Sequence, residues 1–304
     1  MTAVRESKQR LPEWITPMPT SDVIDSTQAP TPSSEIGKTI DVGGVATNYH
    51  DLGTGDPVLL IHGSGPGVSA WANWRLTIPA LAQRHRVIAP DILGFGYTQR
   101  PDGVAYNAET WLEHLVGLLD ALGLDRVSVV GNSFGGALAL RLATRFPHRV
   151  NRLVLMGSVG VLFPITPGLD AVWGYEPSVP AMRHLLGVFA YDPKFATDEL
   201  AELRYRASVR PGVHESYAAM FPEPRQHKVI EMAVSEREIT DLQHETLIVH
   251  GRDDQVIPLA NSHRLLDLIP NSQLHVFARC GHWVQIEHTD RFNTLVDSFL
   301  SGLL

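Results

Sequence analysis

The sequence predicts an α/β protein in which helices cover both faces of a mostly parallel sheet and a helical segment is inserted above it. Short β-rich runs alternate with helical stretches over most of the 304 residues, which is typical of a parallel sheet. The alternation stops between residues 161 and 236, where only helical patterns follow. The sequence therefore predicts one sheet-containing core with an insertion.

Seven runs are expected as strands, and each ends in Gly, Asp or a polar turn. They are VATNYHDLG, PVLLIHG, RVIAPD, RVSVVG, RLVLMG, TLIVHG and QLHVFARC. Helical stretches such as AETWLEHLVGLLDALG and GGALALRLATRF separate several of them. We expect these elements to form a core from residues 37–160 and 237–304.

We expect residues 161–236 to form a helical lid above the sheet. The segment begins with the Pro-rich FPITPG and continues with three helical patterns, VPAMRHLLGVFA, TDELAELRYRASV and PRQHKVIEMAVSE. A long insertion without strand patterns is typical of a lid. The alternative is a set of extra crossover helices with no role in binding a ligand.

One lid helix places an arginine among apolar residues. In TDELAELRYRASV, helical spacing puts Leu200, Leu203, Arg204 and Ala207 on one stripe, with Arg206 about a third of a turn away. Burying an arginine is costly unless it meets an anion. Arg204 is therefore expected to pair either with a buried glutamate or with a substrate carboxylate.

Composition narrows the class of partner. The net charge is -8 and there is no Lys/Arg run, which argues against nucleic acid. No stretch approaches the roughly 18 to 20 apolar residues that cross a bilayer, and the N-terminus lacks the apolar core of a secretory signal. Cys280 is the only cysteine, which excludes an internal disulfide and a multi-cysteine metal site. We expect a cytoplasmic protein whose residues 1–36 form a loosely ordered arm, and the sequence leaves a homo-oligomer open.

The strongest chemical signal is a G-x-S-x-G motif at residues 131–135. It lies between a predicted strand and a predicted helix, the context in which this motif presents a serine on a sharp turn. The flanking glycines let the strand and the helix pass closely, which a serine that only capped a helix would not need. Ser133 is therefore the predicted nucleophile.

A serine nucleophile needs a base, and the base needs an orienting acid. His282, in ARCGHWVQIEH, follows the last predicted strand and is the expected base. Asp253 and Asp254 follow the preceding strand. Asp253 falls in the tight turn, where aspartate commonly bonds its own backbone, so Asp254 is the expected acid. Structural roles are expected for His62, His250, His275 and Cys280.

The loop LLIHGSGPGVSAWANW follows another predicted strand. Its glycines fail the dinucleotide fingerprint G-x-G-x-x-G because Val68 stands at the last position, and no GK[ST] follows. A phosphate site is therefore disfavoured. With a serine nucleophile elsewhere, we expect the N–H groups of Ser64 and Phe134 to form an oxyanion hole.

Together these motifs resemble the meta-cleavage product hydrolases of the α/β-hydrolase fold. The resemblance runs from about Glu35 to the C-terminus. It rests on HGSGPG, ANWR, GFG, GNSFGG, LMGSVG, FAYD, LRYRAS, AAMFPEPRQ, GRDDQVIPL and RCGHWVQIEH, in that order. Two features depart from the family: Ser64 stands where some relatives have glycine, and the residues before Glu35 have no counterpart in the family core.

The resemblance implies a role for each matching position. Ser133, His282 and Asp254 become the catalytic triad, and Ser64 and Phe134 the oxyanion donors. The expected substrate-binding residues at the dienoate end are Asn73, Asn132, Arg204 and Trp283, with Gly63 and Gly65 beside them. Those expected around the departing acyl part are Leu169, Trp173, Val256 and Ile257.

The implied activity is hydrolysis of a carbon–carbon bond in a ring-fission product of aromatic hydrocarbons. The substrate would be an anionic dienoate, 2-hydroxymuconic semialdehyde or a small 6-alkyl analogue, and the products 2-hydroxypenta-2,4-dienoate and a short carboxylic acid. No metal or organic cofactor is implied. The main alternative is a carboxylesterase with the same triad, which leaves Arg204 unexplained. A non-enzymatic ligand receptor would not need the triad, and epoxide hydrolases of this fold need Asp where Ser133 stands.

Overall fold

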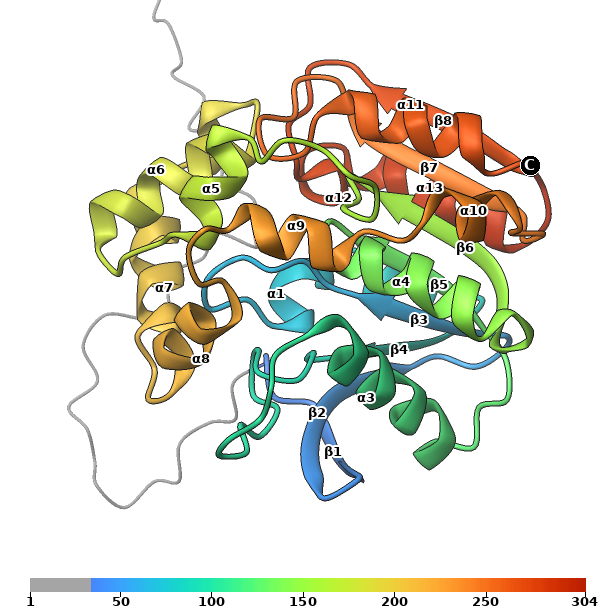
Figure 1. Cartoon of the computed structure of the whole chain (residues 1–304), viewed down its shortest axis with the longest axis horizontal. Helices are drawn as coiled ribbons and strands as arrows, with labels where there is room; N and C mark the ends of the chain where they lie inside the picture. Colours follow the sequence, from blue (N-terminus) through green and yellow to red (C-terminus); the bar gives the residue numbers. More distant parts are fainter. Residues whose placement is uncertain (1–33) are drawn as a thin grey trace, which may run out of the picture. The chain divides into compact units, whose positions relative to one another are not determined.

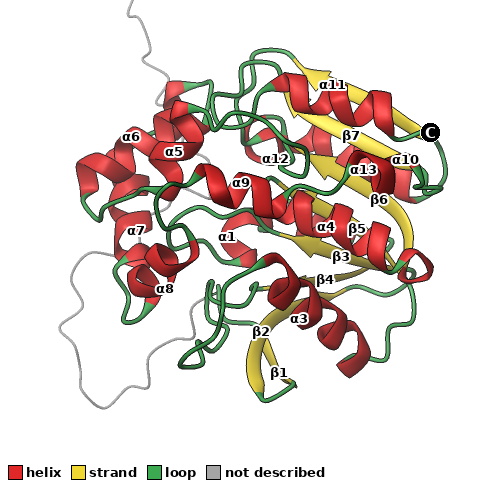
Figure 2. Cartoon of the chain, in the orientation of Figure 1, coloured by secondary structure: helices red, strands yellow, loops and turns green. Residues whose placement is uncertain are grey.

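The computed structural model describes residues 34–304, so the arm expected over residues 1–36 lies outside the description except for residues 34–36. An eight-stranded sheet runs through the described chain in the order β1-β2-β4-β3-β5-β6-β7-β8 (Figure 1, Figure 2). The strands are β1 (Lys38–Val42), β2 (Val45–Leu52), β3 (Pro57–Ile61), β4 (Arg86–Pro90), β5 (Val127–Asn132), β6 (Val150–Met156), β7 (Thr246–Gly251) and β8 (Ser272–Phe277). All pairs from β4 to β8 are parallel, which confirms the predicted sheet.

Strand β1 was not predicted. It pairs antiparallel with β2, which in turn pairs antiparallel with β4 at this edge of the sheet. Gly43 and Gly44, with φ of 59° and 88°, form the turn between β1 and β2, and this pair of left-handed residues is typical of a tight hairpin. The strand KTIDV is mostly exposed, so it carries no apolar run to reveal it.

Helices cover both faces of the sheet. One face carries α3 (Ala108–Ala121), α4 (Phe134–Arg145) and α11 (Leu259–Leu268). The other carries α1 (Ala70–Trp74), α2 (Ile78–Leu81), α12 (Val284–Glu287) and α13 (Thr289–Leu300) (Figure 1). Successive residues of β3 alternate between the two cores: Leu59 and Ile61 belong to one, Val58 and Leu60 to the other. The strands are thus buried on both faces, as parallel strands usually are.

The chain between β6 and β7 forms helices and no strand. They are α5 (Pro167–Trp173), α6 (Val179–Phe189), the 3-10 turn η3 (Pro193–Phe195), α7 (Asp198–Ser208), α8 (Val213–Met220), α9 (Gln226–Met232) and α10 (Glu236–Thr240). Another 3-10 turn, η2 (Pro147–Arg149), lies outside this segment, between α4 and β6. Helices α5 and α8 were not predicted. The predicted apolar stripe of α7 is wrong at Leu203, which is 58% exposed, because the helix buries Ala201 and Ser208 instead.

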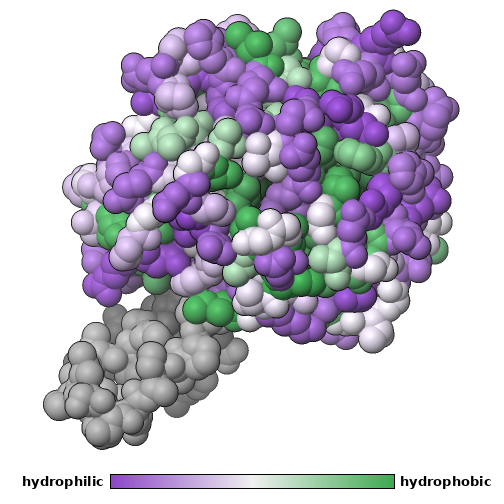
Figure 3. Space-filling view, turned by 60° about the horizontal axis from the view of Figure 1, so that its bottom comes forward, coloured by the Kyte–Doolittle hydropathy of each residue, from purple (hydrophilic) through white to green (hydrophobic). Residues whose placement is uncertain are grey.

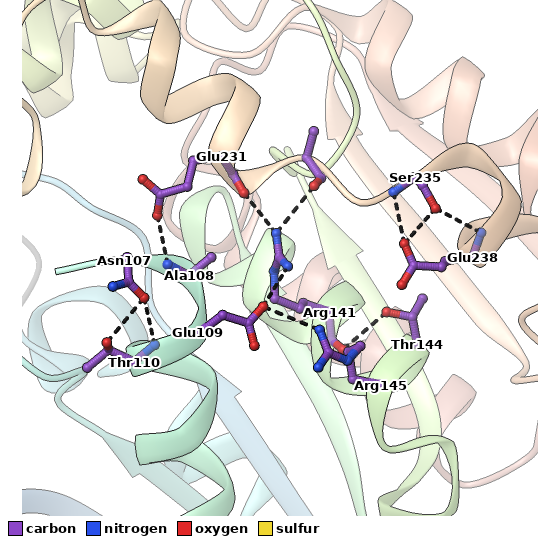
Figure 4. A network of polar contacts seen from close by, with 11 residues as sticks. Asn107, Ala108, Glu109, Thr110, Arg141, Thr144, Arg145, Glu231, Ser235 and Glu238 are labelled. Atoms are coloured by element: carbon purple, nitrogen blue, oxygen red, sulfur yellow. Dashed lines mark hydrogen bonds and ion pairs between the residues drawn. The ribbon is translucent and has the colours of Figure 1, made fainter. Parts of the chain in front are cut away.

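Polar contacts tie the far end of this helical segment to the core. The Glu231 carboxylate, at the end of α9, accepts a hydrogen bond from the Ala108 N–H at 2.7 Å, at the start of α3. Arg141 of α4 donates to the carbonyl oxygens of Glu231 and Ala233 at 2.8 and 3.3 Å (Figure 4). A carboxylate at a helix N-terminus and a guanidinium on two carbonyls are both favourable. Helix α9 is therefore anchored to α3 and α4.

We searched the described residues for helices that could span a membrane. No helix over 34–304 is long and apolar enough to cross a membrane. On the face shown in Figure 3, hydrophilic residues predominate and hydrophobic ones lie in small separate groups.

Candidate active site

Ser133 lies on a sharp turn between β5 and α4. Its φ of 56° and ψ of -115° fall where residues other than glycine rarely lie, a strain on the order of 1–3 kcal/mol. Two glycine contacts enforce the turn. A Cβ on Gly131 would lie 2.5 Å from the carbonyl oxygen of Gly135, and one on Gly135 would lie 2.3 Å from that of Ile61. Only glycine lets the strand and the helix approach this closely.

The end of β6 joins this turn to two other candidate residues. The Ser133 N–H donates to the carbonyl oxygen of Met156 at 2.8 Å. At the next residue, Gly157, a Cβ would lie 3.2 Å from Nδ1 of His282 and 3.3 Å from Oδ2 of Asp254. The structure therefore brings the predicted nucleophile, base and acid to the same edge of the sheet.

Asp254 holds the imidazole of His282. Its Oδ2 lies 2.7 Å from Nδ1 of His282, and the two side chains are 1% and 4% exposed. Its Oδ1 accepts the N–H groups of Val256 and Ile257 at 2.7 and 2.9 Å. Both oxygens are thus occupied, and the carboxylate has a single orientation.

Electrostatics keep this buried carboxyl group ionised. Burial of Asp254 disfavours its charged form, but the charge and hydrogen bond of His282, with smaller contributions, bring the pKa of Asp254 below its ordinary value. Asp254 is therefore a carboxylate near neutral pH. It holds Nδ1 of His282, which leaves Nε2 to exchange a proton with a hydroxyl group.

Asp253, the alternative acid, belongs to the turn. Its N–H donates to the carbonyl oxygen of Cys280 at 2.9 Å, and its Oδ2 accepts the Cys280 N–H at 3.3 Å. Its side chain is 32% exposed, against 1% for Asp254.

Burial and the nearby Glu287 raise the pKa of the Cys280 thiol, so this cysteine is not a thiolate.

The loop after β3 lies against the nucleophile. A Cβ on Gly63 would lie 3.4 Å from Cβ of Ser133. Ser64 is 4% exposed. Phe134 is the first residue of α4, so its N–H has no acceptor within the helix. Backbone N–H groups from both predicted oxyanion residues therefore occur next to Ser133.

His62 orients the peptide that carries the Ser64 N–H. Its Nε2 lies 3.0 Å from the Ile92 N–H and must accept from it, so Nδ1 bears the hydrogen and donates to the Gly63 carbonyl at 2.6 Å. That carbonyl shares a peptide plane with the Ser64 N–H. Burial lowers the pKa of His62 to about 4, which keeps it neutral. The predicted structural histidine thus has a specific task.

The other predicted structural histidines have different surroundings. His250 is fully buried; its Nε2 donates to the Ile257 carbonyl at 3.0 Å and lies 3.4 Å from Oδ2 of Asp254. Burial lowers the pKa of His250. His275 is half-buried on β8, away from these contacts.

Asn73 and Asn132 form a polar pair beside the turn. Nδ2 of Asn132 donates to Oδ1 of Asn73 at 3.2 Å, and a Cβ on Gly63 would lie 3.4 Å from that nitrogen. Within the described chain, Oδ1 of Asn132 is buried without a hydrogen-bond partner. An unpaired buried acceptor is costly, and a donor on a ligand would satisfy it.

Arg204 pairs with a glutamate. Its guanidinium lies 3.3 Å from Oε1 of Glu35 and donates to the carbonyl of Gly67, and its side chain is 13% exposed. Oε2 of Glu35 accepts from the Ser69 hydroxyl at 3.0 Å. The predicted pairing with a glutamate is thus present, and the predicted contact with a substrate carboxylate stays a prediction.

The predicted apolar residues are buried. The exposed fractions of Leu169, Trp173, Val256 and Ile257 do not exceed 2%. Trp173 is not purely apolar, because its indole N–H donates to Oγ of Ser64 at 2.9 Å.

Trp283 and Gly65 share a neighbour that was not predicted. Trp283 stacks on Phe189 with ring centroids 4.9 Å apart, and Phe189 also stacks on His282 at 6.0 Å. A Cβ on Gly65 would lie 3.8 Å from the same ring. Phe189 is the last residue of α6, which the pattern VPAMRHLLGVFA predicted, but nothing in that pattern points to His282.

No metal cluster accompanies these residues. Over residues 34–304, no group of three or more His, Cys, Asp or Glu side chains could hold a metal ion.

The chain is similar to known hydrolases over most of its length. A family model described as alpha/beta hydrolase fold matches residues 56–289. The chain is 63% identical over 270 residues to a 2-hydroxy-6-oxo-2,4-heptadienoate hydrolase of Pseudomonas putida, covering 89% of this chain and 98% of the relative. It is 60% identical over 273 residues to a 2-hydroxymuconate semialdehyde hydrolase of Pseudomonas sp. strain CF600, covering 90% and 96%.

The fold of this chain is also similar to those of solved hydrolase structures. A meta-cleavage product hydrolase from Pseudomonas fluorescens IP01, in complex with acetates, superposes with a TM-score of 0.88 at 57% identity, over 90% of this chain and 100% of that one. A serine hydrolase involved in carbazole degradation superposes with a TM-score of 0.76 at 35% identity, over 88% and 98%.

A pH-dependent stability difference tests the neutral state of His62. Its folded pKa of about 4 lies below the ordinary 6.5, so the unfolded chain binds more protons between these values. The contribution of the neutral His62 to the unfolding free energy is therefore complete above pH 6.5 and is lost as the pH falls toward 4. From about pH 7 to about pH 4.5, the excess unfolding free energy of wild type over His62→Asn should shrink by about 2 kcal/mol. Urea denaturation of both proteins at each pH measures these unfolding free energies. The exposed His148→Asn serves as the control, and an excess that stays constant for His62→Asn would contradict the assignment.

Proposed function

We propose a function from one premise: this chain belongs to the meta-cleavage product hydrolases of the alpha/beta hydrolase fold. It is a serine hydrolase that cleaves a carbon–carbon bond in meta-cleavage products such as 2-hydroxymuconate semialdehyde or 2-hydroxy-6-oxo-2,4-heptadienoate, in aromatic catabolism. The contact between Asp254 and His282, beside the strained Ser133, is the observation that carries our assignment of the chemistry.

The proposed reaction has two stages. First, the C2 enol of the 2-hydroxy-6-oxodienoate loses its proton and C5 gains one, giving a 2,6-diketo acid. Ser133 then attacks the C6 carbonyl while His282 takes the hydroxyl proton. The C5–C6 bond breaks, C5 leaves as a carbanion conjugated with the C2 carbonyl, and protonation gives 2-hydroxypenta-2,4-dienoate. Water releases the acyl group as a short carboxylic acid, which is formate or acetate for the smallest substrates.

We propose the Ser64 and Phe134 N–H groups as the donors that hold the oxyanion at C6. Each such donor contributes on the order of 100- to 1,000-fold in rate because it stabilises charge that appears only during the reaction. The position of Gly63 against Ser133 supports this assignment.

We assign the two ends of the substrate to two groups of residues. The carboxylate and C2 oxygen would meet Arg204, the asparagine pair and Trp283, with Gly63 and Gly65 alongside. The unpaired Oδ1 of Asn132 supports this end because an enol hydroxyl can donate to it. The acyl part would lie among Leu169, Trp173, Val256 and Ile257, which are buried and mostly apolar.

We propose residues 161–236 as the lid over this site. Only helices occur between β6 and β7, and Trp173 of α5 contacts Ser64. The cytoplasmic location and the open oligomeric state stay predictions from the sequence.

Replacing the nucleophile tests the chemistry. Ser133→Ala should lower kcat for 2-hydroxymuconate semialdehyde by roughly 10,000-fold, because no hydroxyl remains to attack C6. The decay of the coloured dienolate measures turnover. Ser128→Ala, at the other end of β5 and also buried, is the matched control and should retain wild-type turnover. Wild-type turnover by Ser133→Ala would refute the assignment.

A second set of variants separates the ion pair of Arg204 from its proposed contact with substrate. Arg204→Gln should lower kcat/KM by about 100-fold, chiefly through KM, because a charged hydrogen bond to the carboxylate is lost. Glu35→Gln breaks the same ion pair but keeps the guanidinium, so it should retain kcat/KM within about threefold. Arg206→Gln, on the exposed side of α7, controls for the charge change.

Steady-state kinetics with the dienoate measure all three variants. Equal losses in Arg204→Gln and Glu35→Gln would show that the ion pair matters only for structure and would contradict the carboxylate role.

A further inference from the structure

Two side chains of the lid segment bond the same residue of the oxyanion loop. The indole N–H of Trp173, on α5, donates to Oγ of Ser64 at 2.9 Å. The hydroxyl of Tyr217, on α8, donates to the carbonyl oxygen of Ser64 at 2.9 Å. All three residues are at most 4% exposed. Both polar groups of Ser64 apart from its N–H therefore have a partner in the lid.

The Tyr217 hydroxyl also joins the two lid helices. It lies 2.7 Å from the carbonyl oxygen of Val172, the residue before Trp173, so one hydroxyl hydrogen is shared between two acceptors. Burial raises the pKa of Tyr217 well above its ordinary value, which keeps the hydroxyl a donor. One atom thus connects α5, α8 and the loop after β3.

An aromatic cluster extends this contact to the second proposed oxyanion residue. Phe221, directly after α8, stacks on Trp173 with centroids 4.8 Å apart and rings 8° from parallel. The same ring packs edge-on against Tyr217 at 5.1 Å and against Phe134 at 6.1 Å. Ser64 and Phe134 therefore rest on one buried group of lid side chains.

We infer that Tyr217 and Trp173 are positioning residues that make the oxyanion hole depend on the placement of the lid. Tyr217 fixes the carbonyl of Ser64 and Trp173 fixes its side chain. Two hydrogen bonds from lid helices therefore hold the loop that carries the Ser64 N–H. A displacement of about 1 Å in such a group costs on the order of 100-fold in rate. The inference rests on the proposed function, because it takes the Ser64 N–H as an oxyanion donor.

Tyr175 offers a matched control. It lies between α5 and α6 and is 4% exposed. Its hydroxyl bonds Oγ of Ser208 on α7 at 3.1 Å, rather than an atom of Ser64. Tyr217→Phe and Tyr175→Phe each remove one buried hydroxyl. If the Tyr217 hydroxyl served only packing, the two variants would behave alike.

The test compares kinetics, inhibitor binding and stability for these two variants. Tyr217→Phe should lower kcat by about 10- to 30-fold with KM within about twofold, on both the dienoate and p-nitrophenyl acetate. Its affinity for phenylboronic acid, which forms a tetrahedral adduct on serine, should fall by a comparable factor. Tyr175→Phe should keep the wild-type kcat, KM and affinity for phenylboronic acid. In urea denaturation, the two variants should lose similar amounts of unfolding free energy.

Ser64→Ala tests the part played by Trp173. It removes the acceptor of the indole N–H but keeps the backbone N–H, so kcat should fall by about three- to tenfold. An unchanged kcat would overturn the role of Trp173. A kcat of Tyr217→Phe within about twofold of wild type, or a loss shared equally by Tyr175→Phe, would overturn the role of Tyr217.

The ester assay separates this inference from the proposed function. If wild type cleaved p-nitrophenyl acetate but not the dienoate, the carbon–carbon activity would fail. The effect of Tyr217→Phe on ester hydrolysis would still decide whether the lid positions the oxyanion hole, because ester hydrolysis forms the same kind of oxyanion.

Discussion

Strands β3 and β5 and helix α4 approach one another closely around Ser133, and this packing positions the other residues of the site. It requires hydrogen in place of a side chain at Gly131 and Gly135, because a Cβ on either would overlap a backbone carbonyl oxygen. One of those oxygens belongs to Ile61, the last residue of β3. The glycines on either side of the strained Ser133 therefore also let the end of β3, and the loop that carries Ser64, approach it closely. The proposed nucleophile and the proposed oxyanion donor are thus positioned by the same packing of β3, β5 and α4.

The parallel sheet delivers the remaining groups to the same edge. Asp254 follows β7 and His282 follows β8, so neighbouring strands place acid and base side by side. Burial by itself raises the pKa of Asp254, and the charge and hydrogen bond of His282, helped by the backbone N–H of Ile257, bring that pKa below its ordinary value. Two side chains hold Ser64 itself: the neutral His62 ring bonds the Gly63 carbonyl of the peptide that carries the Ser64 N–H, and Tyr217 of α8 bonds the Ser64 carbonyl.

Local signals were enough to predict the parallel strands and the turn at Ser133, because glycine spacing and apolar runs reflect nearby contacts. The exposed edge strand β1 lacks such a run. Leu203 is exposed because α7 packs through small residues, which helical periodicity alone does not reveal. Tyr217 and Glu35 act through contacts with residues far away in sequence, so only the fold shows that they bond Ser64 and Arg204. Contacts of this kind depend on how the helices between β6 and β7 pack on the rest of the chain, and no local pattern reveals that packing.

We propose that Asp254, through His282, makes Ser133 a nucleophile. The direct measurement is kcat for the dienoate in Asp254→Asn and Asp253→Asn, two isosteric changes at adjacent positions. Asp254→Asn should lower kcat by about 10,000-fold, because the amide cannot hold the required tautomer of His282, whereas Asp253→Asn should stay within about threefold of wild type. A large loss in Asp253→Asn, with Asp254→Asn active, would show that Asp253 and not Asp254 orients His282.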